Sequence, residues 1–254
     1  MKTMKLSAPD WCFFPEGADP DTYYRKLKAM GYSGVEMVAP ERWQAAKRAG
    51  LEIVNLSGPG MTDGMNRREN RQKLSDEILR MTEDASKNGI PYIIVFSGNQ
   101  GELSDREGLE NCLEGYSALL ERMKGSGVKL LFEMLNSFDH EDYQADTETF
   151  GFEIVETLNS GDFRLLYDIY HMVRGGCDPL QELEKKLPYI AHFHVASLEG
   201  RKFPEPDGAI DYRAFFAAVP EGKFNGYVGM EFFPEDPERD LARAAELFLS
   251  YQRN

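Results

Sequence analysis

Four short apolar stretches of the sequence each end in a side chain that can bind a metal ion. Runs of this length are typical of buried strands, and a charged group at the end of a buried strand needs a compensating partner. Three of the stretches end in a carboxylate and one ends in an imidazole. The four terminal residues are Glu133, Asp168, His194 and Glu231. Together they predict one metal site.

The spacing of these residues matches a chain of repeated strand–helix units. Successive members are separated by 35, 26 and 37 residues, and one such unit takes about 30 residues. The side chains would therefore come from the carboxyl ends of four consecutive strands. A single glutamate at a strand end is more often part of a salt bridge than a metal ligand. A single histidine is more often a core residue whose ring nitrogens are hydrogen-bonded. Four metal-competent side chains at equivalent points are not expected by chance.

The residue types indicate which ions the site would accept. Three carboxylates around a partly buried point cannot all stay ionised without a cation, because burial and mutual repulsion both raise their pKa values. Three oxygen ligands and one imidazole suit one divalent ion, Mn²⁺, Mg²⁺, Co²⁺ or Zn²⁺, and the sequence does not choose among them. His192 and His194 point to the same face of one strand. We expect His194, nearer the carboxyl end, to be the ligand and His192 to support it or pack behind it.

The pattern of apolar and polar residues predicts the elements that would position this site. Strands are predicted from Lys5 and over residues 34–39, 51–56, 90–96, 128–133, 163–168, 189–195 and 227–232. Helices are predicted from Asp19 to Gly31 and over residues 40–50, 66–88, 104–124, 147–158, 178–187, 211–219 and 237–251. Eight strands that alternate with helices favour a parallel sheet closed into a single (β/α)8 TIM barrel, with an open doubly wound sheet as the alternative. The length of 254 residues fits one domain over residues 1–254.

Composition narrows the class of partner. A chain with 42% hydrophobic and 28% charged residues is typical of globular proteins, and no apolar run is long enough to span a membrane. The amino-terminal stretch lacks the apolar segment of a signal peptide, so we expect a cytoplasmic protein. Three cysteines without a CxxC pair predict free thiols. The net charge of −14 disfavours nucleic acid as a partner.

The motifs around the predicted ligands resemble a known family. The stretches are Phe132-Glu-Met-Leu-Asn-Ser-Phe-Asp-His, Leu166-Tyr-Asp-Ile-Tyr-His-Met, Ile190-Ala-His-Phe-His-Val-Ala with Gly200-Arg, and Met230-Glu-Phe-Phe-Pro. They are similar to the hydroxypyruvate isomerase group of the xylose-isomerase-like barrel superfamily of sugar isomerases and epimerases. The resemblance implies that Glu133, Asp168, His194 and Glu231 bind the metal. It also implies that His171 touches a substrate oxygen, that Arg201 contacts substrate and that Asp139 has a role in substrate binding. The histidine at position 194 matches the ketose epimerase branch, since some hydroxypyruvate isomerases have glutamine there.

These observations lead to a predicted reaction. The protein would transfer a proton next to a carbonyl in a small carbohydrate or hydroxy-keto acid, of the hydroxypyruvate or ketose type, through a metal-bound enediolate. Glu133 and Glu231 would flank the carbon as the catalytic acid and base. His171 is expected in a loop just past its strand. Trp11 and Phe138 could wall the pocket, although most such aromatics are core residues.

Other functions fit parts of the same pattern. A lyase or dehydratase would begin with the same proton abstraction, and a hydrolase such as the apurinic-site endonucleases would need more histidines than the four present. A non-catalytic sugar-binding barrel would keep the pocket without needing two opposed glutamates. An apolar helix face could also mediate a homo-oligomer, but periodicity does not distinguish this from packing on the strands.

Overall fold

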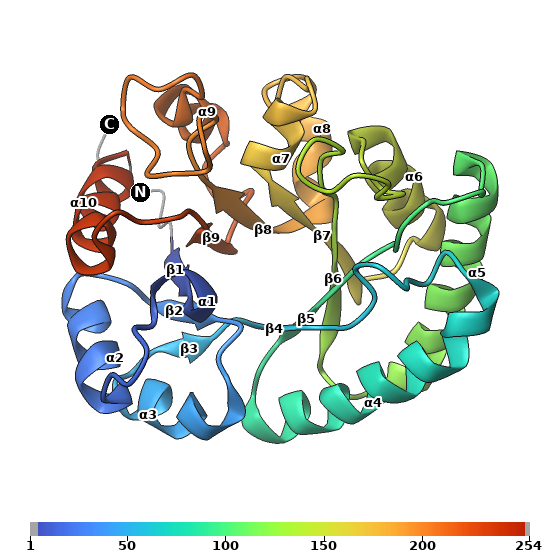
Figure 1. Cartoon of the computed structure of the whole chain (residues 1–254), viewed down its shortest axis with the longest axis horizontal. Coiled ribbons are helices and arrows are strands. Elements are labelled where there is room, and N and C mark those ends of the chain that lie inside the picture. Colours follow the sequence, from blue (N-terminus) through green and yellow to red (C-terminus); the bar gives the residue numbers. More distant parts are fainter. Residues whose placement is uncertain (1–4, 252–254) are drawn as a thin grey trace. The chain divides into compact units, whose positions relative to one another are not determined.

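The computed structural model describes residues 5–251, which form two compact units. The first unit contains the residues up to Asn55 together with those from Asp178 onward, and the second contains Leu56–Cys177. Figure 1 labels the helices and strands of both units.

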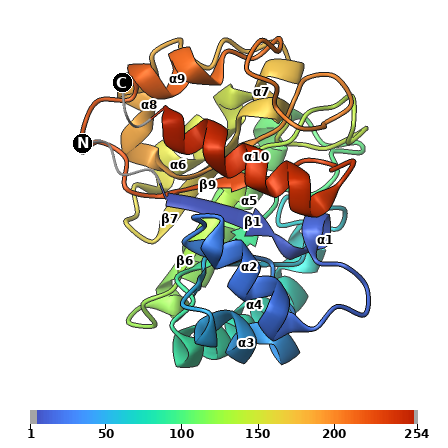
Figure 2. The same ribbon diagram turned by 90° about the vertical axis from the view of Figure 1, so that its left-hand side faces the viewer.

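The first unit is built on a parallel sheet that joins the two ends of the chain. Its strands are β1 (Lys5–Pro9), β2 (Gly34–Glu36), β3 (Glu52–Ile53), β8 (Ile190–Val195) and β9 (Tyr227–Met230). They lie in the order β3-β2-β1-β9-β8, and β1 pairs with β9 from Lys5 opposite Tyr227. Figure 2 shows β1 beside β9, with helix α10 (Pro237–Ser250) in front of them. The first and last strands of the chain are therefore neighbours in this sheet.

Helices follow the strands of this unit, and two of them, α2 and α10, begin where the sequence predicts. They are α1 (Asp10–Phe13), α2 (Pro20–Ala29), η1 (Pro40–Arg42), α3 (Trp43–Arg48), α8 (Leu183–Lys186), η3 (Leu187–Tyr189), α9 (Tyr212–Ala218) and α10. Asp19 caps α2 by accepting a hydrogen bond of 2.9 Å from the Thr22 N–H, and Pro20 follows as the first helical residue. Asp236 caps α10 in the same way, from the N–H of Arg239. These two predicted helix starts are confirmed.

The second unit repeats the same alternation. Its strands are β4 (Asn55–Ser57), which starts at the boundary between the units, β5 (Tyr92–Val95), β6 (Lys129–Glu133) and β7 (Phe163–Asp168), and β5, β6 and β7 pair in parallel. Its helices are η2 (Arg68–Asn70), α4 (Arg71–Asn88), α5 (Asp105–Met123), α6 (Glu148–Leu158) and α7 (Ile169–Arg174). The core under α5 contains the rings of Tyr116, Phe132 and Phe163, which contact one another edge to face or at a tilt.

Two predicted elements differ in the structure. The strand predicted over residues 51–56 is divided into β3 and β4, because the backbone changes partner there: Val54 donates to the Val35 carbonyl, whereas Gly58 donates to that of Ile94. The described residues therefore contain nine strands instead of eight.

The helix predicted over residues 178–187 is the second difference. Only Leu183–Lys186 is α-helical there, and the helix after β7 begins directly at Ile169. This early start follows from a cap, since the Asp168 side chain accepts a hydrogen bond from the Tyr170 N–H. His171, predicted in a loop, lies in this helix instead.

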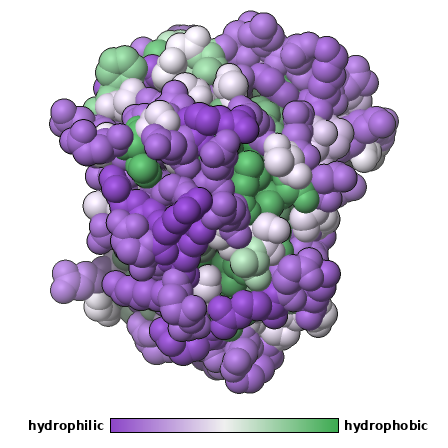
Figure 3. Space-filling view, turned by 90° about the vertical axis from the view of Figure 1, so that its right-hand side faces the viewer, coloured by the Kyte–Doolittle hydropathy of each residue, from purple (hydrophilic) through white to green (hydrophobic). Residues whose placement is uncertain are grey.

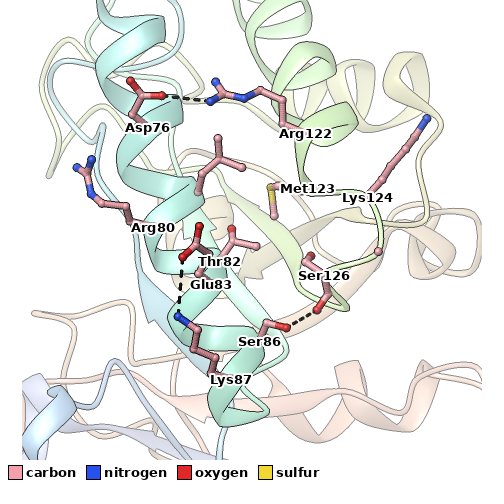
Figure 4. A pocket seen from close by; sticks show the side chains of 12 residues that line it. Asp76, Arg80, Thr82, Glu83, Ser86, Lys87, Arg122, Met123, Lys124 and Ser126 are labelled. Atoms are coloured by element: carbon pink, nitrogen blue, oxygen red, sulfur yellow. Dashed lines mark hydrogen bonds and ion pairs between the residues drawn. The ribbon is translucent and has the colours of Figure 1, made fainter.

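The surface of the second unit carries a groove between α4 and α5. Figure 3 shows the face where α4, α5 and α6 lie, with hydrophilic side chains over most of it and apolar ones between them. The groove has a volume of about 840 Å³, and two ion pairs lie along it, Asp76 with Arg122 and Glu83 with Lys87 (Figure 4). None of the predicted site residues lines it. Within residues 5–251 the structure contains no helix that is long and apolar enough to cross a membrane.

The start of α5 provides a test of the local sequence signals. Ser104 accepts a hydrogen bond from the N–H of Glu107, whose carboxylate accepts one from the N–H of Ser104, so both form a capping box. We expect Ser104→Ala to lower the free energy of unfolding by about 1 kcal/mol, measured by urea titration. Ser117→Ala is the matched control, because Ser117 is exposed in the middle of the same helix. Equal effects of the two changes would contradict the capping role.

Candidate metal centre

Two of the predicted ligands lie at the carboxyl ends of neighbouring strands in the second unit. Glu133 is the last residue of β6 and Asp168 is the last residue of β7. Both side chains are buried, and one ligand atom of each lies within 4.8 Å of the other. The two oxygens of the Asp168 carboxylate have different contacts: Oδ1 caps α7, and Oδ2 lies 3.6 Å from the Nε2 of His171. Two buried carboxylates at this separation are a chemical fit for a cation.

The loop after β6 holds His171 in place. Asn136 contacts the Nδ1 of the His171 ring twice, through its side-chain nitrogen at 2.6 Å and its backbone nitrogen at 3.3 Å. The Asn136 side chain also donates to Asp139, which accepts a second hydrogen bond, 3.1 Å long, from Arg174 on α7. Burial would raise the pKa of Asp139, but hydrogen bonds from Tyr170 and Asn136 hold it below its usual value. Asp139 therefore connects this loop to the helix that carries His171.

The other two predicted ligands lie together in the first unit. His194 is on β8, and Glu231 follows β9 directly. The Nδ1 of His194 lies 3.1 Å from a carboxylate oxygen of Glu231. Burial would raise the pKa of Glu231, but the neighbouring His194 and Arg201 hold it at about 2. An anionic carboxylate and an imidazole nitrogen that face each other also fit a cation between them.

Two more side chains contact Glu231 from the loops. The guanidinium of Arg201, which follows β8, forms an ion pair with one carboxylate oxygen, and the indole N–H of Trp11 donates to the other at 3.1 Å. Trp11 is 49% exposed and packs edge to face on Phe233, which is 51% exposed. Arg201 has a φ of 53°, so this loop holds a non-glycine residue in the left-handed region. The structure therefore pairs Arg201, which the resemblance assigns to substrate binding, with Glu231, one of the two predicted acid–base residues.

Behind His194 lies a buried carboxylate that the sequence analysis missed. Glu36 ends β2, and one of its oxygens, Oε2, lies 2.9 Å from the Nε2 of His194 and 3.0 Å from the Nε2 of His192. Ser7 and Asn55 donate to the same carboxylate, each at 2.6 Å. The signal was present, since Gly34-Val-Glu is also a short run that ends in a carboxylate. His192, predicted to support the ligand or to pack behind it, contacts Glu36 and lies edge to face against the His194 ring.

This arrangement shifts the pKa values of the buried groups. Burial would raise the pKa of Glu36, but the two histidines hold it well below its usual value. Burial would lower the pKa of His194, but Glu231 and Glu36 raise it well above the usual value. Burial dominates for His192 and lowers its pKa. The pKa values of the two histidines on this strand therefore shift in opposite directions, because His194 lies between two carboxylates.

Comparison with known proteins identifies the fold. Residues 24–251 match the model of the xylose isomerase-like TIM barrel family. A solved structure of an AP endonuclease of family 2 from Brucella melitensis has a TM-score of 0.85 at 20% identity, over 96% of this chain and 99% of that chain. The IOLI protein with a binding zinc atom has a TM-score of 0.80 at 17% identity, over 98% of each chain. The predicted single (β/α)8 barrel is confirmed, while one domain over residues 1–254 stays a prediction.

Two curated relatives bear names of the predicted enzyme class. The human protein named "Putative hydroxypyruvate isomerase" is 24% identical over 92% of this chain and 91% of its own length. The 3-dehydro-D-guloside 4-epimerase of Escherichia coli is 23% identical over 92% of this chain and 95% of its own length. The resemblance to the hydroxypyruvate isomerase group is confirmed, and the names of these relatives agree with the predicted class of isomerase or epimerase.

The tight packing around His194 leads to a prediction about Gly229. A Cβ atom on this residue would lie 2.2 Å from an oxygen of Glu36 and 2.6 Å from the His194 ring. Gly229→Ala should therefore displace both side chains and lower the free energy of unfolding by about 1–3 kcal/mol, measured by denaturant titration. Gly161→Ala is the control, because a Cβ atom there would meet nothing within 4 Å. A Gly229→Ala protein as stable as this control would show that the packing is wrongly described.

Proposed function

Because the chain belongs to the xylose isomerase-like TIM barrel family, we propose that it is a metal-dependent isomerase or epimerase. Its substrate would be a small hydroxy-ketone or sugar of the hydroxypyruvate or ketose type. The observation that carries this proposal is the set of buried strand-end ligands, two in each unit: Glu133 beside Asp168, and His194 beside Glu231. A chain that only bound sugars would not need four metal-competent groups buried at strand ends.

The proposed cation site joins the two pairs. In a barrel of this kind, strands that follow one another in the chain are neighbours, and their carboxyl ends surround one mouth. Strands β6, β7, β8 and β9 would then bring Glu133, Asp168, His194 and Glu231 to one Mn²⁺, Mg²⁺, Co²⁺ or Zn²⁺ ion. When bound, this ion would act as a Lewis acid on the substrate carbonyl and its neighbouring hydroxyl.

The protein's own residues would move the proton. Glu231 and Glu133 would lie on opposite sides of the reacting carbon, so that one carboxylate removes its proton and the other returns one. Return to the same carbon from the opposite face gives an epimer, and return to the neighbouring carbon gives an isomer. Both outcomes need the same pair of glutamates, which fits the isomerase and epimerase names of the relatives.

Three further residues would bind and orient the substrate. His171, buried and held by Asn136, would contact a substrate oxygen from α7. Arg201 would grip a hydroxyl or carboxylate with its forked guanidinium donors. Asp139 would act through its contacts with Asn136 and Arg174, which keep the loop after β6 in place. A cytoplasmic location and a homo-oligomer stay predictions.

Replacing the two glutamates tests the proton transfer. We expect Glu133→Gln and Glu231→Gln each to slow deuterium uptake from D₂O into substrate by about 10²- to 10⁴-fold, because an amide is no general base. The measurement is NMR of hydroxypyruvate and a panel of ketoses. Glu184→Gln, on an exposed residue of α8, is the control for the loss of one negative charge. Unchanged exchange in both variants would rule out the two glutamates as acid and base.

Removal of the metal tests the cation site separately. Chelation should abolish exchange and lower the melting temperature, because an ion that binds only the folded chain stabilises it by about 2.7 kcal/mol at a free concentration of 100 times its dissociation constant. Adding Mn²⁺, Mg²⁺, Co²⁺ or Zn²⁺ one at a time should restore both properties with at least one ion. Elemental analysis should find one ion per chain. A chelated enzyme with full activity would exclude metal dependence.

A further inference from the structure

One buried carboxylate near the proposed ligands has no part in the proposed reaction. Glu36 ends β2 and is fully buried in the sheet of the first unit. An ionised carboxylate in such a place is costly unless hydrogen bonds and positive charge compensate it. The contacts of Glu36 show which group it holds.

Within the first unit, the ring of His194 lies between two carboxylates that contact different nitrogens. Its Nδ1 lies 3.1 Å from Glu231, and its Nε2 lies 2.9 Å from Glu36. A neutral imidazole has one N–H and one free electron pair, so a proton kept on Nε2 by Glu36 leaves the electron pair on Nδ1. With a cation bound, that electron pair would face the side of the ring on which the proposed ligand Glu231 lies.

We propose that Glu36 is a positioning residue, which fixes the tautomer and the ring orientation of His194 so that Nδ1 is the atom that binds the cation. This inference rests on the proposed function. A metal-binding histidine commonly donates its other N–H to a carboxylate, and this contact raises the basicity of the ligand nitrogen. Glu36 supplies this contact from a different strand.

The carboxylate is itself held rigidly. Its Oε1 accepts a hydrogen bond from Ser7 on β1, and its Oε2 accepts one from Asn55 on β4. Gly229 on β9 also packs closely against the carboxylate, since a Cβ atom there would lie 2.2 Å from Glu36 Oε1. Contacts from several strands therefore fix the carboxylate, and the carboxylate fixes the ring.

The same residues could in principle bind a cation themselves, because ligand atoms of Glu36, His192 and His194 all lie within 4.8 Å of one another. For Glu36 and His194, hydrogen bonding explains the contact better. The Glu36 Oε2 already receives the Asn55 amide at 2.6 Å, and both histidine nitrogens lie at hydrogen-bond distance from it. A second cation here would have to displace the Asn55 amide and the proton between Glu36 and His194.

Zinc binding by Glu36 variants tests this role. We expect one Zn²⁺ per wild-type chain in calorimetric titration, about tenfold weaker binding in Glu36→Gln, and up to about 100-fold weaker binding in Glu36→Ala. Glutamine keeps an oxygen that can accept the Nε2–H, which explains the intermediate value. Ser7→Ala is the matched control, because it removes a donor to Oε1 and leaves the Oε2 contacts in place; it should bind zinc within threefold of wild type.

NMR of the zinc-loaded protein gives a readout that a merely structural role would not change. Long-range ¹H–¹⁵N correlation should show His194 protonated at Nε2, with a low-field signal typical of a hydrogen bond to a carboxylate. In Glu36→Gln, at a melting temperature near that of wild type, this signal should move upfield. In Glu36→Ala it should be lost.

The outcomes separate this inference from the proposed function. A wild-type chain that binds no divalent ion would overturn the proposed function and this inference with it. Wild-type affinity and an unchanged His194 signal in Glu36→Ala would overturn this inference alone. Two zinc ions per wild-type chain and one in Glu36→Ala would also overturn it, because Glu36 would then be a ligand.

Discussion

The structure depends on one constraint, the burial of carboxylates at the ends of strands. Glu36, Glu133, Asp168 and Glu231 are buried, and an isolated buried charge would cost far more free energy than a folded domain has available. In the first unit the compensation is visible: Glu36 lies against two histidines, and Glu231 lies against His194 and Arg201. In the second unit, Asp168 accepts a hydrogen bond from the Tyr170 N–H at the start of α7. Glu36, Asp168 and Glu231 thus each fix neighbouring groups of the fold as well as having a part in the proposed chemistry.

How much of this could be predicted from the sequence depended on where each strand was predicted to end. The strands that carry Glu133, Asp168 and His194 contain five or six residues, so an apolar run that ends in a ligand was recognisable. The strand of Glu36 was predicted over residues 34–39 but ends at Glu36, so the prediction placed this carboxylate inside the strand and not at its end. The early start of α7 was missed for a different reason. Asp168 was interpreted only as a ligand, whereas its other oxygen also caps the helix that carries His171.

Contacts between distant residues could not be predicted at all from one sequence. Asn136 lies 35 positions before His171 and contacts its ring, and Glu36 lies 158 positions before His194. No local pattern marks such a residue, because an asparagine in a loop or a glutamate in a strand has many ordinary explanations. The spacing of the ligands was informative only because each repeat unit places its strand end at an equivalent point. The supporting residues follow no such repeat.

Two exposed aromatic side chains beside the buried Glu231 suggest where the substrate lies. Trp11 gives its N–H to this buried carboxylate while about half of its surface faces solvent, and Phe233 beside it is similarly exposed. Large apolar side chains are seldom left exposed in pairs unless a ligand covers them. In the proposed reaction, a small substrate lying against these rings would exclude water from Glu231, which strengthens every electrostatic contact there. Trp11 would then orient the Glu231 carboxylate through its N–H and cover the bound substrate with its ring. One residue would therefore both orient this carboxylate and exclude water from it.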